Sequence, residues 1–393
     1  MLIESALGDA ERAFLAEVRA FLAAELDPAL VAADDAQRSF IADHERGNRW
    51  IDRLRPRRWH VGHWPAAHGG AGLTPMENYL LQYEQGLHGA PAAPPMGLAY
   101  VGPTVIRFGT EAQRAAVLPP LIEGRDHWCQ GFSEPGAGSD LARVQTFAER
   151  RGERYVINGS KIWTTDAQHA NKIFVLLRTR RDESREALSF FLVDMATPGV
   201  TVRPLRMLTG DHEFNQVFFD DVKVGPEALL AGEGQGWAVA RFLLEIERGS
   251  FVFGGRLRRR LARLEARLRA AGRVDAQVEH ALARLDRDLL AYEMTELRLG
   301  TLAQGGALQN AAANLIKIDW TELLVRMDEL ALACADPPAL CADGAPLREG
   351  ELSMPGWLAS RFNNLAAPIY GGSNEVQRNL VFRTLRQAWG SAR

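Results

Sequence analysis

Apolar residues recur every three or four positions toward both ends of the chain, whereas short apolar runs separated by turns fill its middle. We therefore predict helices from about residue 9 to 124, with Asp9 as the cap of the first helix. One face of that helix gathers Phe14, Leu15, Val18, Phe21 and Leu22. Further on, Thr110 and Gln113 have the spacing of a capping box, which predicts another helix start.

The middle of the chain predicts a small β domain. Strand-like runs follow one another at residues 145–165, 171–180, 187–195, 199–208 and 215–224. The first run breaks at Gly152 and at the Asn158–Gly159 pair, and both breaks predict hairpin turns. Several short strands in series are typical of an all-β domain, which we place at about residues 126–232.

Long helices are predicted after residue 234, over residues 236–256, 277–303 and 309–335. Their lengths favour a helical bundle over short insertions. The predicted fold is thus α+β and multidomain, with a helical domain at residues 1–125, a β domain at 126–232 and a helical bundle at 233–393. A chain of 393 residues has room for two or three such domains.

Charge argues against nucleic acid as a partner. The net charge of -3 gives the chain no overall basic field. The one basic run, residues 255–273, carries leucines at helical spacing beside an arginine-rich face. We interpret that face as a solvated helix surface rather than a nucleic-acid or membrane patch.

Cysteine usage and the N-terminus favour a cytoplasmic protein. The three cysteines form no CxxC pair, so we expect no disulfide, no zinc site and no other metal site. The first 26 residues lack the basic and apolar regions of a signal peptide. No run is long and apolar enough to span a bilayer, so membrane insertion is not expected.

The segment WCQGFSEPGAGSDLARVQT, residues 128–146, carries the strongest chemical signal. It combines hydroxyls, a proline-fixed turn and two glycines, Gly136 and Gly138, around a small residue. Such a loop can expose backbone N–H groups to a flat heterocycle and a pyrophosphate. It is not a Rossmann fingerprint, because a strand rather than a helix is predicted after it. A plain turn is the alternative.

A second candidate element is NGSKIWTTDA, residues 158–167. Trp163 and Thr165 lie two residues apart in a predicted strand, so we expect them on one face. A tryptophan beside a hydroxyl can cover a ring and hydrogen-bond its edge. The alternative is a core tryptophan with a surface threonine.

Together these segments resemble the acyl-CoA dehydrogenase family. The resemblance is carried by GFSEPGAGSD, NGSKIWTT and IYGGSNEVQRN, and by HWPAAHGGAGLT, FGTEAQRAAVLPPLIEG and AGEGQGW, in the family's order over most of the chain. It implies an N-terminal helical domain, a central β-barrel-like domain and a C-terminal four-helix bundle. It also implies an FAD between the β domain and the bundle, often reaching a neighbouring subunit.

Residues at the family's motif positions imply which side chains and backbone groups contact the cofactor. Phe132 would hold the flavin through its backbone, and Ser133 through its backbone and hydroxyl. Trp163 would cover the ring, and Thr165 would bond near its reactive nitrogen. Ser139 would lie near the pyrophosphate or the thioester end of the substrate. The other implied cofactor residues are Gln130, Gly138, Ser373 and Glu375.

The family's reaction is α,β-dehydrogenation of an acyl-CoA thioester, in which a carboxylate takes the α-proton and flavin N5 takes the β-hydride. Many members carry that carboxylate directly after the tyrosine matching Tyr370, where this chain has Gly371. We expect Tyr370 and Gly371 to contact the substrate, with the Gly371 N–H pointing at the thioester oxygen. Ser373 and Glu375 match flavin-facing positions, although capping of the next helix is an equal alternative for Glu375.

The catalytic base is therefore expected on the helix over residues 236–256. One face of it carries Leu243, Leu244, Glu247 and Phe251. A carboxylate within an apolar stripe is a functional candidate, whereas Glu245 lies on the other side of the helix. Some family members place the base on this helix before an arginine, a pattern that Glu247–Arg248 matches, with Arg248 supporting the substrate site. A structural ion pair is the alternative.

Adjacent glycines at 371 and 372 leave room for a bulky or branched acyl group, and the pattern resembles bacterial members linked to sterol side chains. Common homotetrameric members of the family carry a Phe–Gly pair after the first bundle helix, where it contacts a neighbour's FAD. This chain lacks that pair, so we expect either a homo-oligomer or a heterotetramer with a second acyl-CoA dehydrogenase-like subunit. An electron-transferring flavoprotein is the family's usual acceptor. Alternatives are a flavin-dependent monooxygenase or oxidase, a non-catalytic partner subunit and, more distantly, a DNA-associated relative.

Overall fold

The computed structural model describes residue 4 and residues 7–35, 44–92, 94–182, 184–249, 252–301, 307–336 and 356–390. The chain forms two compact units. The first comprises Met1–Arg53, Leu73–Ala93 and Phe251–Arg393, and the second comprises Leu54–Gly72 and Pro94–Ser250. The units therefore divide the predicted N-terminal segment between them, and the boundaries 1–125, 126–232 and 233–393 stay predictions about sequence segments.

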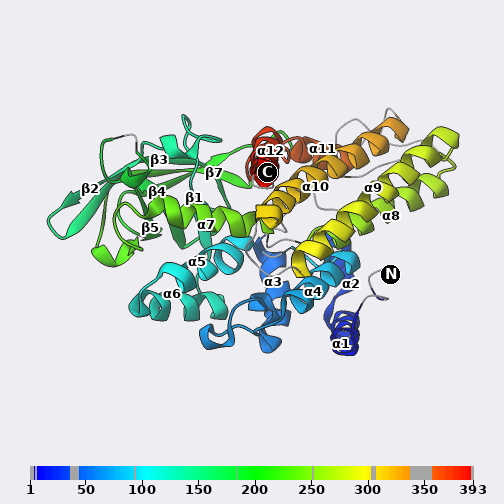
Figure 1. The fold of residues 1–393 in the computed structure, drawn as a ribbon, viewed down its shortest axis with the longest axis horizontal. Helices are drawn as coiled ribbons and strands as arrows, with labels where there is room; N and C mark the ends of the chain where they lie inside the picture. Colours follow the sequence, from blue (N-terminus) through cyan, green and yellow to red (C-terminus); the bar gives the residue numbers. More distant parts are fainter. Residues whose placement is uncertain are drawn as a thin grey trace. The chain divides into compact units, whose positions relative to one another are not determined.

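The first unit is built from helices. They are α1 (Asp9–Glu25), α2 (Pro28–Asp35), α3 (His44–Leu54), α4 (Pro75–His88), α8 (Gly254–Ala270), α9 (Ala276–Thr301), α10 (Ala307–Cys334), α11 (Trp357–Asn364) and α12 (Asn374–Gly390). Helices α8, α9 and α10 lie side by side (Figure 1). The predicted leucine face of α8 is buried, with Leu261 and Leu264 in one core with Trp320 and Met327 of α10. The predicted bundle is confirmed in these helices.

The arginine-rich face of α8 corrects one prediction. Arg256 lies 3.2 Å from Asp34, and Arg259 and Arg263 lie 2.7 and 2.9 Å from Asp35. Both aspartates come from the end of α2, within the same unit. The predicted solvated face is therefore wrong at these positions, because their charges are used within the fold.

The second unit is built on an eight-stranded sheet (Figure 1). Its strands are β1 (Trp128–Gly131), β2 (Phe147–Arg151), β3 (Arg154–Thr165), β4 (Lys172–Arg178), β5 (Leu188–Asp194), β6 (Val200–Leu205), β7 (Phe214–Val224) and β8 (Leu229–Leu230). The order is β6-β7-β3-β2-β4-β5-β8, and β1 pairs with β4. The predicted small β domain is confirmed.

Helices α5 (Gly102–Phe108), α6 (Glu111–Glu123) and α7 (Gly236–Gly249) complete the second unit. Shorter helical turns lie at Arg55–Arg57, Trp59–Val61, Ala66–His68, Met96–Val101, Leu141–Arg143, Arg185–Ala187 and Pro226–Ala228. Helix α7 packs on β5 and β4, and its Leu243 is fully buried. The single helix predicted over residues 236–256 is wrong, because α7 ends at Gly249 and α8 starts at Gly254.

The predicted helix caps differ in outcome. The Thr110 N–H donates to Gln113 Oε1 at 3.0 Å, and the Gln113 N–H donates to Thr110 Oγ1 at 3.2 Å, as predicted. Asp9 is not the cap of α1 but its first helical residue. Gly8 holds the cap position, and its N–H donates to the Glu11 carboxylate at 2.8 Å.

One predicted hairpin is confirmed and the other is wrong. The chain turns between β2 and β3 at Gly152, whose φ is 63°. Asn158 and Gly159 instead lie inside β3, where the register against β7 shifts between Ile157 and Gly159. Gly159 has a φ of 138°, and a Cβ there would meet Thr146 at 2.7 Å. The Asn–Gly pair therefore forms a bulge rather than a turn.

None of the helices in the described part of the chain has the length and apolar character needed to cross a membrane. No group of three or more His, Cys, Asp or Glu side chains there is arranged to hold a metal ion.

Candidate functional site

The glycine-rich segment starts where β1 ends at Gly131. The Phe132 side chain is buried. Its ring packs edge-on against those of Phe174 and Phe190, with ring centroids 5.8 and 6.0 Å apart. Because the side chain is used by the core, the backbone is what Phe132 can offer a ligand. The preceding Gln130 is half-buried on β1.

The loop after Phe132 closes as a tight turn whose rim is open. The N–H groups of Glu134 and Ala137 donate to each other's carbonyls at 2.9 and 3.0 Å. Gly136, Gly138 and Ser139 are exposed. A Cβ added at Gly136 or Gly138 would meet nothing within 4 Å, and neither has a positive φ. The chain itself therefore leaves room at both glycines for a ligand to approach the backbone.

The base of this loop is held by a buried ion pair. Lys161 of β3 is fully buried, and its Nζ lies 2.7 Å from Glu134 Oε1. Burial lowers the pKa of Lys161 to about 8, although Glu134 opposes this shift. Burial alone would raise the pKa of Glu134, but the Lys161 ammonium and backbone N–H groups hold it below its usual value.

Trp163 lies at a second irregularity of β3. Its φ is 60°, a strained value for a residue with a side chain, and its side chain is 60% exposed. The register against β7 shifts between Lys161 and Thr164, and Thr165 is buried. Simple alternation therefore does not apply here, and the shared face of Trp163 and Thr165 stays a prediction. The exposed indole contradicts the alternative of a core tryptophan.

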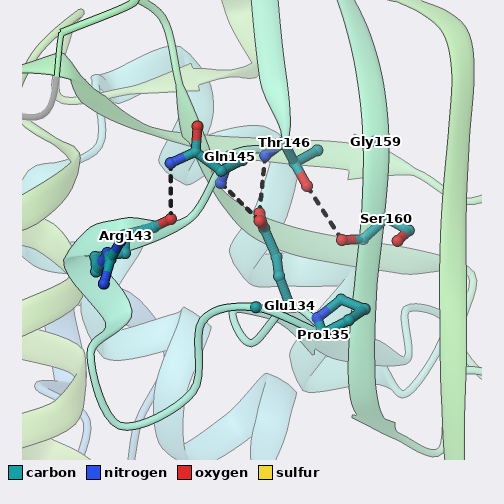
Figure 2. Close-up of a pocket in the computed structure, with 8 residues that line it drawn as sticks. Glu134, Pro135, Arg143, Gln145, Thr146, Gly159 and Ser160 are labelled. Atoms are coloured by element: carbon teal, nitrogen blue, oxygen red, sulfur yellow. Dashed lines mark hydrogen bonds between the residues drawn. The ribbon is translucent and has the colours of Figure 1, made fainter.

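A cavity of about 360 Å³ lies beside the loop, lined by residues 134–136, 143, 145, 146, 159 and 160 (Figure 2). Figure 2 shows the Glu134 carboxylate reaching the backbone of Gln145 and Thr146 within it. Gly136 of the glycine-rich loop lines this cavity, whereas none of the predicted cofactor or substrate contacts does.

Helix α7 presents Glu247 on its buried side. Val239, Ala240 and Leu243 are fully buried, and Glu247 follows them at helical spacing. Glu247 is half-buried, and its Oε2 is shielded from water. Glu245 is exposed and lies 3.8 Å from Arg241. The predicted contrast between the two glutamates is therefore confirmed, whereas the Arg248 and Phe251 side chains lie outside the described residues.

The C-terminal loop belongs to the first unit, and its two adjacent glycines have a left-handed backbone. Gly371 and Gly372 have φ values of 63° and 86°. Gln377 of α12 is buried, and its Nε2 donates to both of their carbonyls at 3.2 Å. Tyr370 is partly exposed, with its ring 6.4 Å from that of Trp320.

Ser373 and Glu375 lie at the start of α12. The Val376 N–H donates to Ser373 Oγ at 3.4 Å, so Ser373 caps the helix. Glu375 is exposed in the first turn, where backbone N–H donation and the Ser373 hydroxyl lower its pKa. Capping is thus observed for Ser373, whereas the capping alternative for Glu375 and cofactor contact by both residues stay predictions.

Sequence reasoning missed the buried polar groups beneath both loops. Under the C-terminal loop, Lys317 Nζ donates to the Ala367 carbonyl at 3.0 Å and to Asn374 Oδ1 at 2.9 Å. Under the glycine-rich loop, Lys161 Nζ likewise donates to a backbone carbonyl, that of Phe132. For Lys317 the available signal was its position between Ile316 and Ile318, because a buried ammonium group needs acceptors.

Comparison with protein families gives matches along the whole chain. The model described as acyl-CoA dehydrogenase, N-terminal domain matches residues 8–125. The models for the middle domain and the C-terminal domain match residues 129–222 and 234–386. A curated relative, acyl-CoA dehydrogenase IpdE1 of Mycobacterium tuberculosis, is 36% identical over 376 residues, which are 94% of this chain and 95% of that protein.

Two solved structures are similar over nearly the full length. The ChsE4-ChsE5 complex from Mycobacterium tuberculosis has a TM-score of 0.81 at 25% identity, covering 97% of this chain and 98% of that chain. The Tcur3481-Tcur3483 steroid ACAD has a TM-score of 0.80 at 25% identity, covering 95% of this chain and 96% of that chain.

Proposed function

The chain belongs to the acyl-CoA dehydrogenase family, and we propose that it oxidises the Cα–Cβ bond of a bulky or branched acyl-CoA with Glu247 as the base. One observation carries the choice of base. Glu247 extends the buried face of α7 and keeps one carboxylate oxygen away from water, whereas Glu245 faces solvent.

FAD is the cofactor, and when bound it supplies a two-electron acceptor for the β-hydride. The open rim at Gly136 and Gly138 and the exposed indole of Trp163 suit a flat ring with a pyrophosphate. The residues that would hold it are Gln130, Phe132, Ser133, Gly138, Ser139, Trp163, Thr165, Ser373 and Glu375.

The chain's own chemistry is proton removal and charge stabilisation. The α-C–H of a thioester is a weak acid, and a carboxylate shielded from water accepts a proton more readily than an exposed one. Glu247 accepts that proton. The Gly371 N–H donates to the thioester oxygen as negative charge develops there. Ser139, Arg248 and Tyr370 are the other substrate contacts in this proposal.

The substrate class follows from the missing side chains and from the relatives. Gly371 and Gly372 leave the C-terminal loop without side chains where many family members carry the base. A similar structure is described as a steroid ACAD, at 25% identity. We therefore favour a steroid-derived acyl-CoA as the bulky substrate of this enzyme.

The oligomer is proposed on the same basis. Both similar structures pair two differently named proteins, ChsE4 with ChsE5 and Tcur3481 with Tcur3483. We propose that this chain works as a homo-oligomer or in a heterotetramer with a second acyl-CoA dehydrogenase-like subunit. An electron-transferring flavoprotein in the cytoplasm would reoxidise the enzyme.

Replacement of the proposed base tests this function. Glu247→Gln should slow anaerobic flavin reduction by acyl-CoA about 100-fold or more, because the amide cannot take the α-proton. Glu245→Gln is the matched control on the same helix, and it should reduce at the wild-type rate. Both variants should retain FAD. Wild-type reduction in Glu247→Gln would remove Glu247 as the base, and turnover without acyl-CoA dehydrogenation would favour the oxidase alternative.

A further inference from the structure

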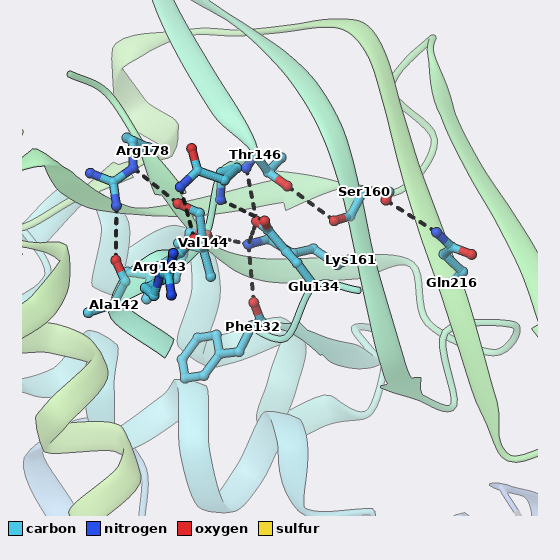
Figure 3. Close-up of polar contacts among 12 residues, drawn as sticks. Phe132, Glu134, Ala142, Arg143, Val144, Thr146, Ser160, Lys161, Arg178 and Gln216 are labelled. Carbon is cyan, nitrogen blue, oxygen red and sulfur yellow. Dashed lines mark hydrogen bonds and ion pairs between the residues drawn. The ribbon is translucent and has the colours of Figure 1, made fainter. Parts of the chain in front are cut away.

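We propose that Lys161 is a positioning residue for the flavin, because its buried ammonium group fixes the glycine-rich loop to the strand that carries Trp163. The inference rests on the proposed FAD site and assigns a role to a residue outside the predicted contacts. Figure 3 shows the side chain reaching the start of the loop from β3.

The ammonium group uses all three of its donors. Lys161 Nζ donates to the Phe132 carbonyl at 3.1 Å, to Glu134 Oε1 at 2.7 Å and to the Leu176 carbonyl at 2.7 Å. An ammonium group has three protons and no acceptor, so its bonding capacity is filled. Two of the three acceptors belong to the first residues of the loop, and the third anchors the amine to β4.

Glu134 carries the same constraint to the far end of the loop. Its Oε2 accepts the Gln145 N–H at 2.6 Å, and its Oε1 accepts the Thr146 N–H at 2.9 Å. The Thr146 hydroxyl donates to the Ser160 carbonyl at 3.1 Å, beside Lys161 on β3. The ion pair therefore closes the loop at both of its ends (Figure 3).

The same strand holds the two parts of the predicted flavin surface in register. The Ile162 N–H donates to the Ser133 carbonyl at 2.9 Å, directly after Lys161 and directly before Trp163. Phe132 and Ser133 are thus tied to β3 at the bulge where Trp163 adopts its strained backbone. A shift of Lys161 would move the backbone donors of the loop relative to the indole.

Polar contacts hold this loop more than apolar packing does. Its central residues, Pro135 to Asp140, are exposed except for Ala137. At its end, Arg178 donates to the Val144 and Ala142 carbonyls at 3.0 and 2.9 Å. A buried pair of this kind adds little stability over an apolar pair of equal size, and defining one geometry is the better-attested use. A binding loop needs that geometry to hold its ligand.

Lys161→Met tests the proposal, because methionine keeps a long side chain without charge or donors. The purified assembly is stripped of FAD and titrated with FAD, without acyl-CoA, at a temperature where it stays folded. We expect the FAD dissociation constant to rise about 10- to 100-fold, as for other residues that orient a binding group, and the visible spectrum of bound flavin to change. Lys172→Met is the matched control, since Lys172 pairs with Asp194 at 2.6 Å elsewhere on the sheet. It should bind FAD as the wild type does.

The outcomes separate this inference from the proposed function. A Lys161→Met assembly that melts earlier but binds FAD with wild-type affinity and spectrum overturns the positioning role. If that variant does not fold, Glu134→Gln takes its place, because it keeps the shape and removes the charge, and unchanged FAD affinity there overturns the role equally. A wild type that binds FAD but is reduced by no acyl-CoA overturns the proposed function alone, and one that binds no FAD overturns both.

Discussion

Gly371 and Gly372 give the C-terminal loop a backbone that other residues adopt only with strain. Both have positive φ values, and Gln377 fixes both carbonyls from within the core. The shape of the loop therefore depends on glycine at both positions.

Gly371→Ala should lower the free energy of unfolding by about 1–2 kcal/mol, the cost of a left-handed backbone with a side chain. Chemical denaturation of the purified protein measures it. Gly136→Ala is the control, because its φ is not positive and its Cβ would meet nothing within 4 Å. Equal stability of Gly371→Ala and the wild type would show that the loop relaxes freely.

One buried carboxyl group, that of Glu296, holds the first residues of α8 in place. Glu296 of α9 accepts the Phe253 N–H at 2.7 Å and the Gly254 N–H at 3.1 Å, and the Tyr292 hydroxyl donates to it at 2.7 Å. These bonds satisfy N–H groups that the first turn of a helix leaves unpaired. Burial raises the pKa of Glu296 to about 8, although these donors oppose the shift.

This raised pKa predicts a pH dependence of stability. Between about pH 4.5 and 8 the unfolded carboxyl ionises while the folded one keeps its proton, so the contribution of Glu296 to stability falls as pH rises. The free energy of unfolding of the wild type should fall relative to Glu296→Gln by about 1 kcal/mol or more across that window. Denaturant titrations of both proteins at several pH values measure the difference. A difference independent of pH would contradict the assignment.

Elements with strong periodicity could be predicted, whereas those set by tertiary contacts could not. The strands and the buried leucines of α8 follow from apolar spacing alone. The Asn158–Gly159 bulge depends on the approach of Thr146, a residue that directly precedes β2. The burial of Lys161 depends on acceptors from β4 and from the glycine-rich loop, all of them distant from it in the sequence.

At the scale of the whole molecule, the matched family segments follow one another from residue 8 to 386. In the most basic helix, α8, three arginines form ion pairs with Asp34 and Asp35 of the same unit. This agrees with a net charge of -3 and with a small-molecule substrate rather than nucleic acid. The family could be predicted from six sequence segments, but the acyl group and the partner chain could not, since both depend on surfaces that short motifs do not define.

Anaerobic titration of the purified, FAD-loaded assembly with short, branched and steroid-derived acyl-CoAs tests the central claim most directly. The account predicts that the visible absorbance of oxidised flavin bleaches with the steroid-derived or another bulky acyl-CoA at the lowest concentration, and that Glu247→Gln bleaches about 100-fold more slowly or less. A wild-type flavin that stays oxidised with every acyl-CoA would contradict the account.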